Sequence, residues 1–408
     1  MTRAQLRSGE AHARMLITVP DLRRGGGVAH FYERLEPYLP GDTRLFVIGK
    51  RPGEHGPLAA GARLAGDGVS LWRELGADDR SVLIVNPSLD AKSLVRDGVV
   101  VQTAKARGRR VVVFIRGWQD GTERTIDGRL GRAFAASFLG ADAVIVLAGR
   151  FRAALRRWGY RGPVHTATTV VADDALGAAN AGAVAASGER DAPLNVLFLS
   201  RIRADKGVYE ALEAVRLAQR RGLDLRMSVA GDGPDLPRAA RWVNERGVAH
   251  VRFLGDVRGE DKRQLMTASD IYLLPTSHGE GMPATLLEAM AYGMGVITAS
   301  VGGVGDFFED GVHGLVTADA HPSTLAGRLE TLARDSALRA RLGLEAQRFA
   351  RLHFTPRRGA DRLLAVVDQV RDAQDGAVAP DTDWFAPSGA GADSPAGVEA
   401  DTTGETGR

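Results

Sequence analysis

The sequence predicts an α/β fold made of two doubly wound domains that face each other across a cleft. Two successive series of continuous Val, Ile and Leu runs are separated by helix-length intervals, as expected for parallel sheets covered on both faces. Between the two series, residues 174–193 are rich in Ala, Gly, Asn and Ser and have little periodicity, which is typical of a linker. A chain of 408 residues is also long enough for two hydrophobic cores.

Six segments are expected along the chain. They are a flexible leader (1–13), an N-terminal domain (14–173), the linker (174–193), a C-terminal domain (194–353), a last helix (354–375) and a disordered tail (376–408). The tail is predicted from its Pro, Gly, Ala, Asp, Ser and Thr content, which offers little apolar surface to bury. An Asp381-Thr382-Asp383 triplet in this tail does not indicate a metal site, because it lies outside any strand–helix unit.

Apolar runs locate five strands in each domain. In the first domain they are residues 15–20, 45–48, 82–85, 111–115 and 143–147. In the second domain they are residues 196–199, 226–230, 251–254, 271–274 and 296–298. Ligands of open parallel sheets bind at the carboxyl ends of the strands, so the cleft between the domains is the expected site.

Composition excludes several classes of function. The net charge of +3 is small and the basic residues form no patch of the kind that binds nucleic acid. The absence of Cys excludes disulfides, thiolate metal sites and a Cys nucleophile. Residues 1–7 lack the apolar core of a signal peptide, and no run reaches the about 18 apolar residues that span a bilayer. These observations favour a soluble or peripheral protein.

A glycine-rich turn follows the first predicted strand. Gly25, Gly26 and Gly27 precede a helix, and glycines at such a turn permit positive φ angles and close approach of a ligand to the backbone. The spacing is not that of the G-x-G-x-x-G dinucleotide fingerprint. A tight strand-to-helix connection explains these glycines as well as a binding role does.

Two glutamates lie eight residues apart after the predicted strand 271–274. Glu280 precedes a helix that Pro283 begins and Gly293 ends, and Glu288 lies inside that helix. The first backbone N–H groups of a helix lack intrahelical partners and form a ready anion site. A single acid at a helix start would indicate only a favourable interaction with the helix dipole.

The string E-G-M-P-x-x-x-x-E-A-M-A-x-G around this pair resembles the E-x7-E signature of the retaining glycosyltransferases of family 4, which have the GT-B architecture. The resemblance implies that Glu288 contacts the ribose of a nucleotide-sugar and that Glu280 lies beside the transferred sugar. It implies that the backbone between them holds the diphosphate. The donor-binding residues are then Glu288, Gly281, Met282, Thr285 and Leu286, together with Gly26, Gly27 and Val257.

Further motifs extend the resemblance through the second half of the chain. Residues 200–207 resemble a G-R-x-x-x-x-K-G element with Ser200 in place of its first Gly. The resemblance implies that Arg201 and Lys206 are catalytic and that their positive charges face the diphosphate. Residues 231–234 resemble a G-x-G-P turn, and residues 301–306 resemble a V-G-G-[IV]-x-[DE] loop. The backbone around Val257 matches the position near the nucleotide base. The last helix of the resembled architecture crosses back onto the first domain.

The first domain departs from the family at Arg116, where many members have a His. Arg116 follows the predicted strand 111–115, so it is placed to contact the acceptor, a phosphate or an acidic sugar, or to pair with a neighbouring carboxylate. Residues 150–158 form a basic, amphipathic stretch. Such a helix suits an anionic membrane surface, but the pattern favours an ordinary solvated surface helix.

The resemblance implies retention of anomeric configuration by front-face attack, without a metal or other cofactor. The partners are a nucleotide-sugar donor and a glycan or lipid-linked acceptor, in bacterial cell-surface polysaccharide or glycolipid biosynthesis. The expected location is the cytoplasm, with peripheral contact to the inner face of the membrane. One alternative is a nucleotide-sugar-binding protein without catalysis on the same scaffold. Another, a nicotinamide-dependent dehydrogenase, lacks the glycine fingerprint and a suitably placed ribose acid.

Overall fold

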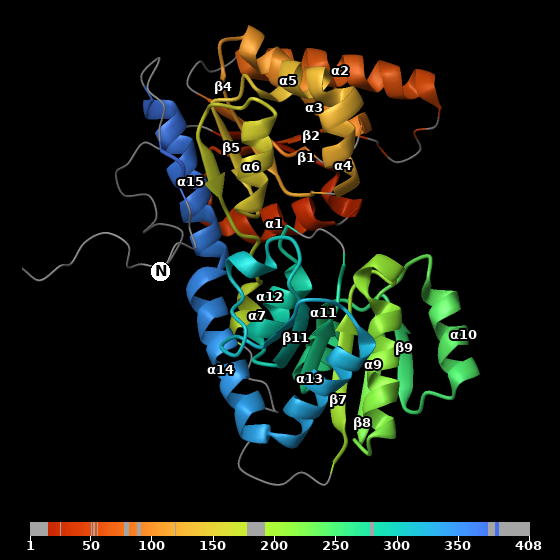
Figure 1. The fold of residues 1–408 in the computed structure, drawn as a ribbon. Coiled ribbons are helices and arrows are strands. Elements are labelled where there is room, and N and C mark those ends of the chain that lie inside the picture. Colours follow the sequence, from red (N-terminus) through yellow and green to blue (C-terminus); the bar gives the residue numbers. More distant parts are fainter. Residues whose placement is uncertain are drawn as a thin grey trace, which may run out of the picture.

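The computed structural model describes residues 15–24, 26–49, 51, 54, 56–76, 81–87, 91–118, 120–177, 192–277, 281–373 and 380–382. Two α/β domains lie one above the other (Figure 1). Each contains a six-stranded sheet in which all neighbouring strands are parallel. The predicted fold class is therefore confirmed.

The first sheet has the strand order β2-β1-β3-β4-β5-β6. Its strands are β1 (Met15–Val19), β2 (Arg44–Val47), β3 (Val82–Val85), β4 (Arg110–Ile115), β5 (Ala143–Val146) and β6 (Val164–Thr166). The second sheet has the order β12-β11-β10-β7-β8-β9. Its strands are β7 (Leu194–Leu199), β8 (Leu225–Ala230), β9 (Val251–Gly255), β10 (Ile271–Leu274), β11 (Gly295–Ala299) and β12 (Leu315–Thr317).

Helices flank both sheets. Those of the first domain are η2 (Leu22–Arg24), α1 (Gly27–Leu35), η3 (Glu36–Tyr38), α2 (Pro57–Gly76), α3 (Ala91–Ala106), α4 (Asp120–Thr125), η4 (Ile126–Leu130), α5 (Gly131–Phe138) and α6 (Arg150–Arg157). The following ones are α7 (Asp173–Gly177), η5 (Ala204–Lys206), α9 (Val208–Arg220), α10 (Leu236–Arg246), α11 (Gly259–Thr267), α12 (Ala284–Ala291), η6 (Val304–Asp306), α13 (Pro322–Arg334), α14 (Ser336–His353) and α15 (Pro356–Asp372).

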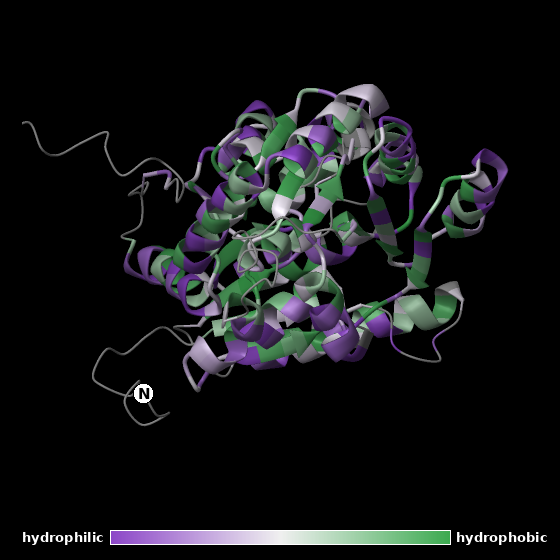
Figure 2. Cartoon of the chain, turned by 90° about the horizontal axis from the view of Figure 1, so that it is seen from below, coloured by the Kyte–Doolittle hydropathy of each residue, from purple (hydrophilic) through white to green (hydrophobic). Residues whose placement is uncertain are grey.

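Burial on both faces explains the continuous apolar runs of the strands. In β4, Val112 and Phe114 belong to one hydrophobic cluster, whereas Val111, Val113 and Ile115 belong to the cluster on the other face. Successive side chains of a strand point to opposite faces, so a strand covered on both faces needs apolar residues throughout. Figure 2 shows hydrophobic residues along the strands and hydrophilic ones on the outer sides of the helices.

The last helix joins the two domains. α14 packs against α12 of the second domain, and α15 then packs against α1, β3 and β4 of the first (Figure 1). Gly359 permits a close approach here, because a Cβ at this position would lie 2.5 Å from Cγ1 of Val170. The Arg362 side chain donates a hydrogen bond from Nη1 to Oγ1 of Thr168 at 2.9 Å. The predicted C-terminal helix thus lies across the first domain.

Two strands are absent from the predicted set. β6 and β12 each contain three residues and include Thr or His, so neither forms a long apolar run. β6 and β12 also each lie at one edge of their sheet. The predicted linker differs as well, because its first residues belong to α7; residues 178–191 lie outside the described part of the chain.

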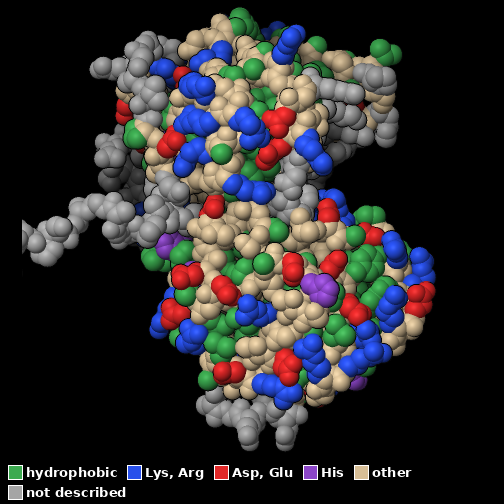
Figure 3. All heavy atoms as spheres, in the orientation of Figure 1, with side chains coloured by type: hydrophobic (Ala, Val, Ile, Leu, Met, Phe, Trp, Pro, Cys, Tyr) green, Lys and Arg blue, Asp and Glu red, His purple; other side chains and the backbone are tan. Residues whose placement is uncertain are grey.

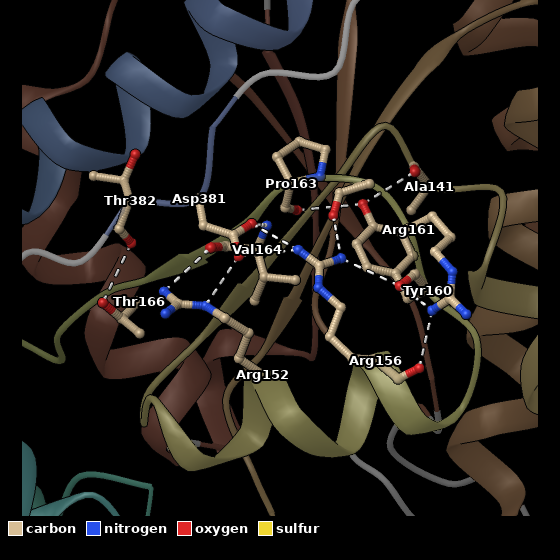
Figure 4. A network of polar contacts seen from close by, with 11 residues as sticks. Ala141, Arg152, Arg156, Tyr160, Arg161, Pro163, Val164, Thr166, Asp381 and Thr382 are labelled. Atoms are coloured by element: carbon tan, nitrogen blue, oxygen red, sulfur yellow. Dashed lines mark hydrogen bonds and ion pairs between the residues drawn. The ribbon is translucent and has the colours of Figure 1, made fainter.

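Two residues of the predicted disordered tail, Asp381 and Thr382, instead contact the first domain (Figure 4). Thr166 donates its backbone N–H to the carbonyl of Thr382 at 3.0 Å, and Val164 donates its own to Oδ1 of Asp381 at 2.8 Å. Oδ1 of Asp381 also accepts from Nη2 of Arg156 at 2.7 Å. Thr382 therefore forms an isolated β-bridge with His165 at the outer edge of β6. Composition does not predict this contact, because a few specific groups form it. They are the Asp381 carboxylate and the Thr382 carbonyl of the tail, and two arginines and two backbone N–H groups of the first domain.

Candidate functional site

A cavity of about 410 Å³ lies between the two domains. The carboxyl ends of β7, β8 and β9 and the first turn of α12 contribute one wall, and α1 contributes the other. Its lining residues are Gly26, Gly27, His30, Phe31, Arg34, Thr169, Leu199, Ser200, Arg201, Gly231, Asp232, Asp256, Val257, Lys262, Ala284, Thr285 and Glu288. The position agrees with the rule that open parallel sheets bind ligands at the carboxyl ends of their strands.

The glycine-rich turn lines the cavity from the first domain. Gly26 precedes α1 with a φ of 106°, a conformation that side-chain-bearing residues rarely adopt. Apart from the adjoining residues and the backbone of α1 itself, no heavy atom of the described residues lies within 4 Å of where a Cβ of Gly26 or Gly27 would be. These glycines thus leave open space beside the first backbone N–H groups of α1, which lack intrahelical partners.

Glu288 is the acidic centre of the cavity. Its side chain is only 7% exposed, although it lies on α12 and lines the cavity. Oε1 accepts from Nη2 of Arg34 at 3.1 Å, and Oε2 accepts from Nζ of Lys262 at 2.6 Å. Arg34 lies on α1 and Lys262 on α11, so the carboxylate is bound by one cation from each domain. Charge-assisted hydrogen bonds of this kind fix its orientation.

The loop before α12 packs directly against the first domain. A Cβ at Gly281 would lie 3.1 Å from Cβ of Leu147, and the backbone N–H of Thr169 contacts Sδ of Met282 at 3.3 Å. A Cβ at Gly303 would lie 2.1 Å from the carbonyl oxygen of Gly281, which no substituted residue tolerates. Glu280 lies outside the described residues.

The start of α12 differs slightly from the prediction. Pro283 precedes the helix rather than occupying its first turn. Ala284 and Thr285 follow it and line the cavity, with Oγ1 of Thr285 accepting from the Tyr272 hydroxyl at 2.7 Å. Leu286 and Met282 are buried and lie outside the lining, so only their backbone could serve a ligand.

The two predicted catalytic cations occupy different environments. Arg201 is exposed and lines the cavity, whereas Lys206 is only 3% exposed and lies outside the lining. The chain is compact just after Lys206, because Gly207 has a φ of 79° and a Cβ there would lie 2.2 Å from the carbonyl oxygen of Pro275. Arg203, between the two, pairs with Asp205 at 2.5 Å instead.

The other predicted positions also meet at this cavity. Val257 lines it beside Asp256, just after β9. Gly231 lies at the end of β8 with a φ of 129°, and a Cβ there would lie 1.9 Å from the carbonyl oxygen of Ser200. The structure therefore brings together Gly26, Gly27, Arg201, Val257, Thr285 and Glu288 around one space.

Arg116 lies behind the wall of the cavity rather than in it. Its guanidinium carbon is 3.7 Å from the ring centre of Phe31, and Nη2 donates to Oγ1 of Thr169 at 3.2 Å. Its Nε and Nη1 atoms are buried and have no hydrogen-bond partner among the described residues. Burial lowers the pKa of Arg116 to about 10. Both of its neighbours line the cavity, so Arg116 supports that wall.

The basic stretch 150–158 forms α6 and carries several ion pairs. Arg152 and Arg156 contact the Asp381 carboxylate, at 3.4 and 2.7 Å, as Figure 4 shows. Arg157 contacts Glu123 at 3.3 Å and Asp127 at 3.4 Å. In Figure 3, basic and acidic side chains accordingly alternate on this face of the upper domain. None of the described helices combines the length and the apolar character needed to cross a membrane.

Sequence reasoning missed the two cations that hold Glu288. The position of Arg34 at the cavity could have been predicted, because Arg34 lies seven residues after Gly27 and therefore on the same face of α1. The position of Lys262 was not predictable, since it lies on α11 and no local sequence pattern indicates its contact with Glu288 on α12. His30, Asp232 and Asp256 were also missed, and each lines the cavity.

Comparison with protein families gives one match in the second domain. The model of the family "Glycosyl transferases group 1" matches residues 183–349. The alpha-D-kanosaminyltransferase of Streptomyces kanamyceticus is 28% identical over 181 residues, which are 44% of this chain and 46% of that protein. Spore coat protein SA of Bacillus subtilis is 29% identical over 184 residues, which are 43% of this chain and 49% of that protein. The chain thus spans about half the length of these curated relatives.

Solved structures extend the comparison to both domains. Anabaena HepE in complex with UDP and glucose superposes with a TM-score of 0.67 at 18% identity, covering 88% of this chain and 100% of that one. Sucrose-phosphate synthase of Thermosynechococcus elongatus gives 0.69 at 17% identity, covering 88% and 99%. The chain therefore has the two-domain GT-B fold of glycosyltransferases, and its second domain matches the group 1 glycosyl transferases.

Proposed function

We propose that this protein is a retaining glycosyltransferase of family 4. It moves a sugar from a nucleotide-sugar donor to a glycan or lipid-linked acceptor in bacterial cell-surface polysaccharide or glycolipid biosynthesis. The observation that carries the proposal is the interdomain cavity, in which Glu288, Arg201 and the first turn of α12 meet. Two relatives support the pathway, because they are described as glycosyltransferases of colanic acid and amylovoran biosynthesis.

The chemistry of sugar transfer suits these groups. Cleavage of the donor leaves a diphosphate, whose developing negative charge needs fixed positive partners. Arg201 and the N-terminus of α12 can supply them, and Lys206, buried under the same turn, adds a further positive charge. The two oxygens of Glu288 each have a lone pair left for a ribose hydroxyl. The base then lies near Val257.

In this proposal, the side chain of Glu280 contacts the transferred sugar. Its carboxylate either binds sugar hydroxyls or stabilises the oxocarbenium-like centre. A leaving phosphate oxygen takes the acceptor proton as the acceptor oxygen attacks from the same face, so the anomeric configuration is retained. Arg116 contacts the acceptor or a phosphate only if the Phe31 side of the wall opens, because Phe31 lines the cavity and Arg116 lies behind it.

A donor panel tests this function directly. Thermal unfolding is measured with UDP-, GDP- and dTDP-sugars, since a ligand that binds only the folded state raises its stability by mass action. UDP-glucose is the first choice, because HepE was also crystallised with it. We expect at least one donor to raise the midpoint and to be consumed with a suitable acceptor. Binding without transfer or hydrolysis would favour the non-catalytic alternative, and no binding by any donor would overturn the proposal.

Metal independence is the first prediction. Transfer should continue in excess EDTA at an unchanged initial rate, because the positive charge opposite the diphosphate comes from Arg201, Lys206 and α12. The measurement compares initial rates with EDTA alone and with added Mn²⁺ or Mg²⁺. Loss of activity in EDTA that either ion restores would contradict the proposed site.

The second prediction concerns the membrane. We propose that the protein is cytoplasmic and contacts the inner face of the membrane through residues 150–158. Arg152, Arg156 and Arg157 already face carboxylates, so retention on anionic vesicles should be weak and confined to low salt. Sedimentation with phosphatidylglycerol vesicles measures it, with phosphatidylcholine vesicles as the control. Asp381→Asn should increase retention, and an absence of retention at low salt would contradict the membrane contact.

A further inference from the structure

Arg34 and Lys262 bind the same carboxylate from opposite sides of the cleft. Their contacts with Glu288 are 3.1 and 2.6 Å long, and the two side chains are similarly exposed, at 25% and 28%. They differ in origin: Lys262 shares a domain with Glu288, whereas Arg34 belongs to the first domain. Only the Arg34 contact depends on how the two domains face each other.

The Arg34 guanidinium is held from its own side of the cleft. Nη1 donates to the carbonyl oxygen of Val170 at 2.7 Å, while Nη2 reaches Glu288. Val170 is buried where α15 crosses the first domain. This backbone contact fixes the direction in which Arg34 points, so its second amino group meets the carboxylate only when the domains are close.

The Glu288 carboxylate retains room for a ligand. Each oxygen has two lone pairs, and the two cations use one on each oxygen. A ribose can therefore donate hydroxyl hydrogen bonds while Arg34 and Lys262 stay in place. With two cations and one anion, the cluster also keeps an excess positive charge beside the proposed diphosphate position.

We infer that Arg34 is a positioning residue that makes nucleotide binding depend on the closed arrangement of the two domains. The inference rests on the proposed function. Arg34 orients Glu288 from the first domain before the nucleotide arrives. A ligand that binds the oriented carboxylate better favours the arrangement in which Arg34 reaches it, because a ligand shifts a population toward the state it binds more tightly. Lys262 orients the same carboxylate from within the second domain, so its contact does not depend on the position of the first domain.

Another interdomain contact provides a control. The carboxylate of Asp306, on η6, accepts from the backbone N–H of Gly149 at 2.6 Å. This contact joins the same two domains but lies outside the cavity lining. Asp306→Ala therefore removes an interdomain contact away from the cavity, whereas Lys262→Met removes a contact of Glu288 within the second domain. Arg34→Met removes a contact of Glu288 that also joins the two domains.

The experiment measures domain separation and nucleotide binding in the same variants. The chain has no Cys, so the double substitution Arg132→Cys and Arg241→Cys places one dye on α5 and one on α10 for energy transfer. Nucleotide binding is measured by calorimetry with UDP, and the titration is repeated with GDP and with dTDP. Arg34→Lys tests rescue, because it keeps the charge but cannot donate to Val170 and Glu288 from one planar group.

Arg34→Met should lower energy transfer in the absence of nucleotide and weaken nucleotide binding by about tenfold. Lys262→Met should weaken binding similarly with wild-type energy transfer, and Asp306→Ala should lower energy transfer with a smaller loss of affinity. Arg34→Lys should recover part of both losses. Wild-type energy transfer in ligand-free Arg34→Met would overturn the inference, as would unchanged nucleotide affinity. If the wild type binds none of the three diphosphates, the proposed function fails, while the ligand-free comparison still decides the interdomain contact.

Discussion

Arg201→Ala should lower kcat/KM by about 10²–10³-fold while the protein remains folded. Removing one fixed donor from a developing oxyanion typically costs on the order of 3 kcal/mol in the transition state. Arg201 is exposed at the mouth of the turn after β7 and lines the cavity, so its loss removes charge without opening either core. Initial rates with the donor found by the panel, at several donor concentrations, separate the effect on kcat from that on KM.

The same turn offers a matched control. Arg203 is two residues away and pairs with Asp205, and it does not line the cavity. Arg203→Ala should therefore change kcat/KM by less than about threefold, as expected for a partly exposed ion pair. Equal losses for the two variants would mean that the turn as a whole, rather than the charge of Arg201, matters for transfer.

The order of elements was predictable because both sheets are parallel and covered on both faces. Apolar runs such as Val111–Ile115 identify such strands by composition alone. β6 and β12 were missed since edge strands of three residues need no such run. The docking of Asp381 and Thr382 on β6 was also missed, because one ion-pair cluster holds a segment whose composition predicts disorder.

The positions of site residues were predictable where a local motif determines them, and they were not predictable where tertiary packing determines them. Arg201, Glu288 and the glycines at 26 and 27 lie at strand-to-helix turns, so their positions follow from the parallel topology. Lys206 was expected in the cavity, but the compact turn at Gly207 buries it instead. Lys262 lies 26 residues before Glu288 in the sequence, and no periodic sequence pattern predicts their contact.

Glu288→Gln should weaken binding of the donor and of the free nucleoside diphosphate alike, by about 10–100-fold. Gln keeps the size of the side chain but loses the charge that accepts strong hydrogen bonds, each worth about 1.5–3 kcal/mol when one partner is ionised. The substitution also leaves Arg34 and Lys262 without their shared anion in the cavity. Their positive charge then attracts the diphosphate more strongly, so the loss should be smaller at low salt than at high salt.

Glu280→Gln should leave nucleotide affinity nearly intact and lower turnover, because the proposed partner of Glu280 is the sugar rather than the nucleotide. Calorimetry with the diphosphate and initial rates with the full donor measure the two effects separately, and circular dichroism checks that both variants fold. The two variants control each other, since each removes one charge from the same loop–helix unit. If Glu280→Gln lost nucleotide binding while Glu288→Gln bound and turned over normally, the two assigned roles would be reversed. The ionic-strength dependence expected for Glu288→Gln adds a second check, because it follows from the contacts of Glu288 with Arg34 and Lys262.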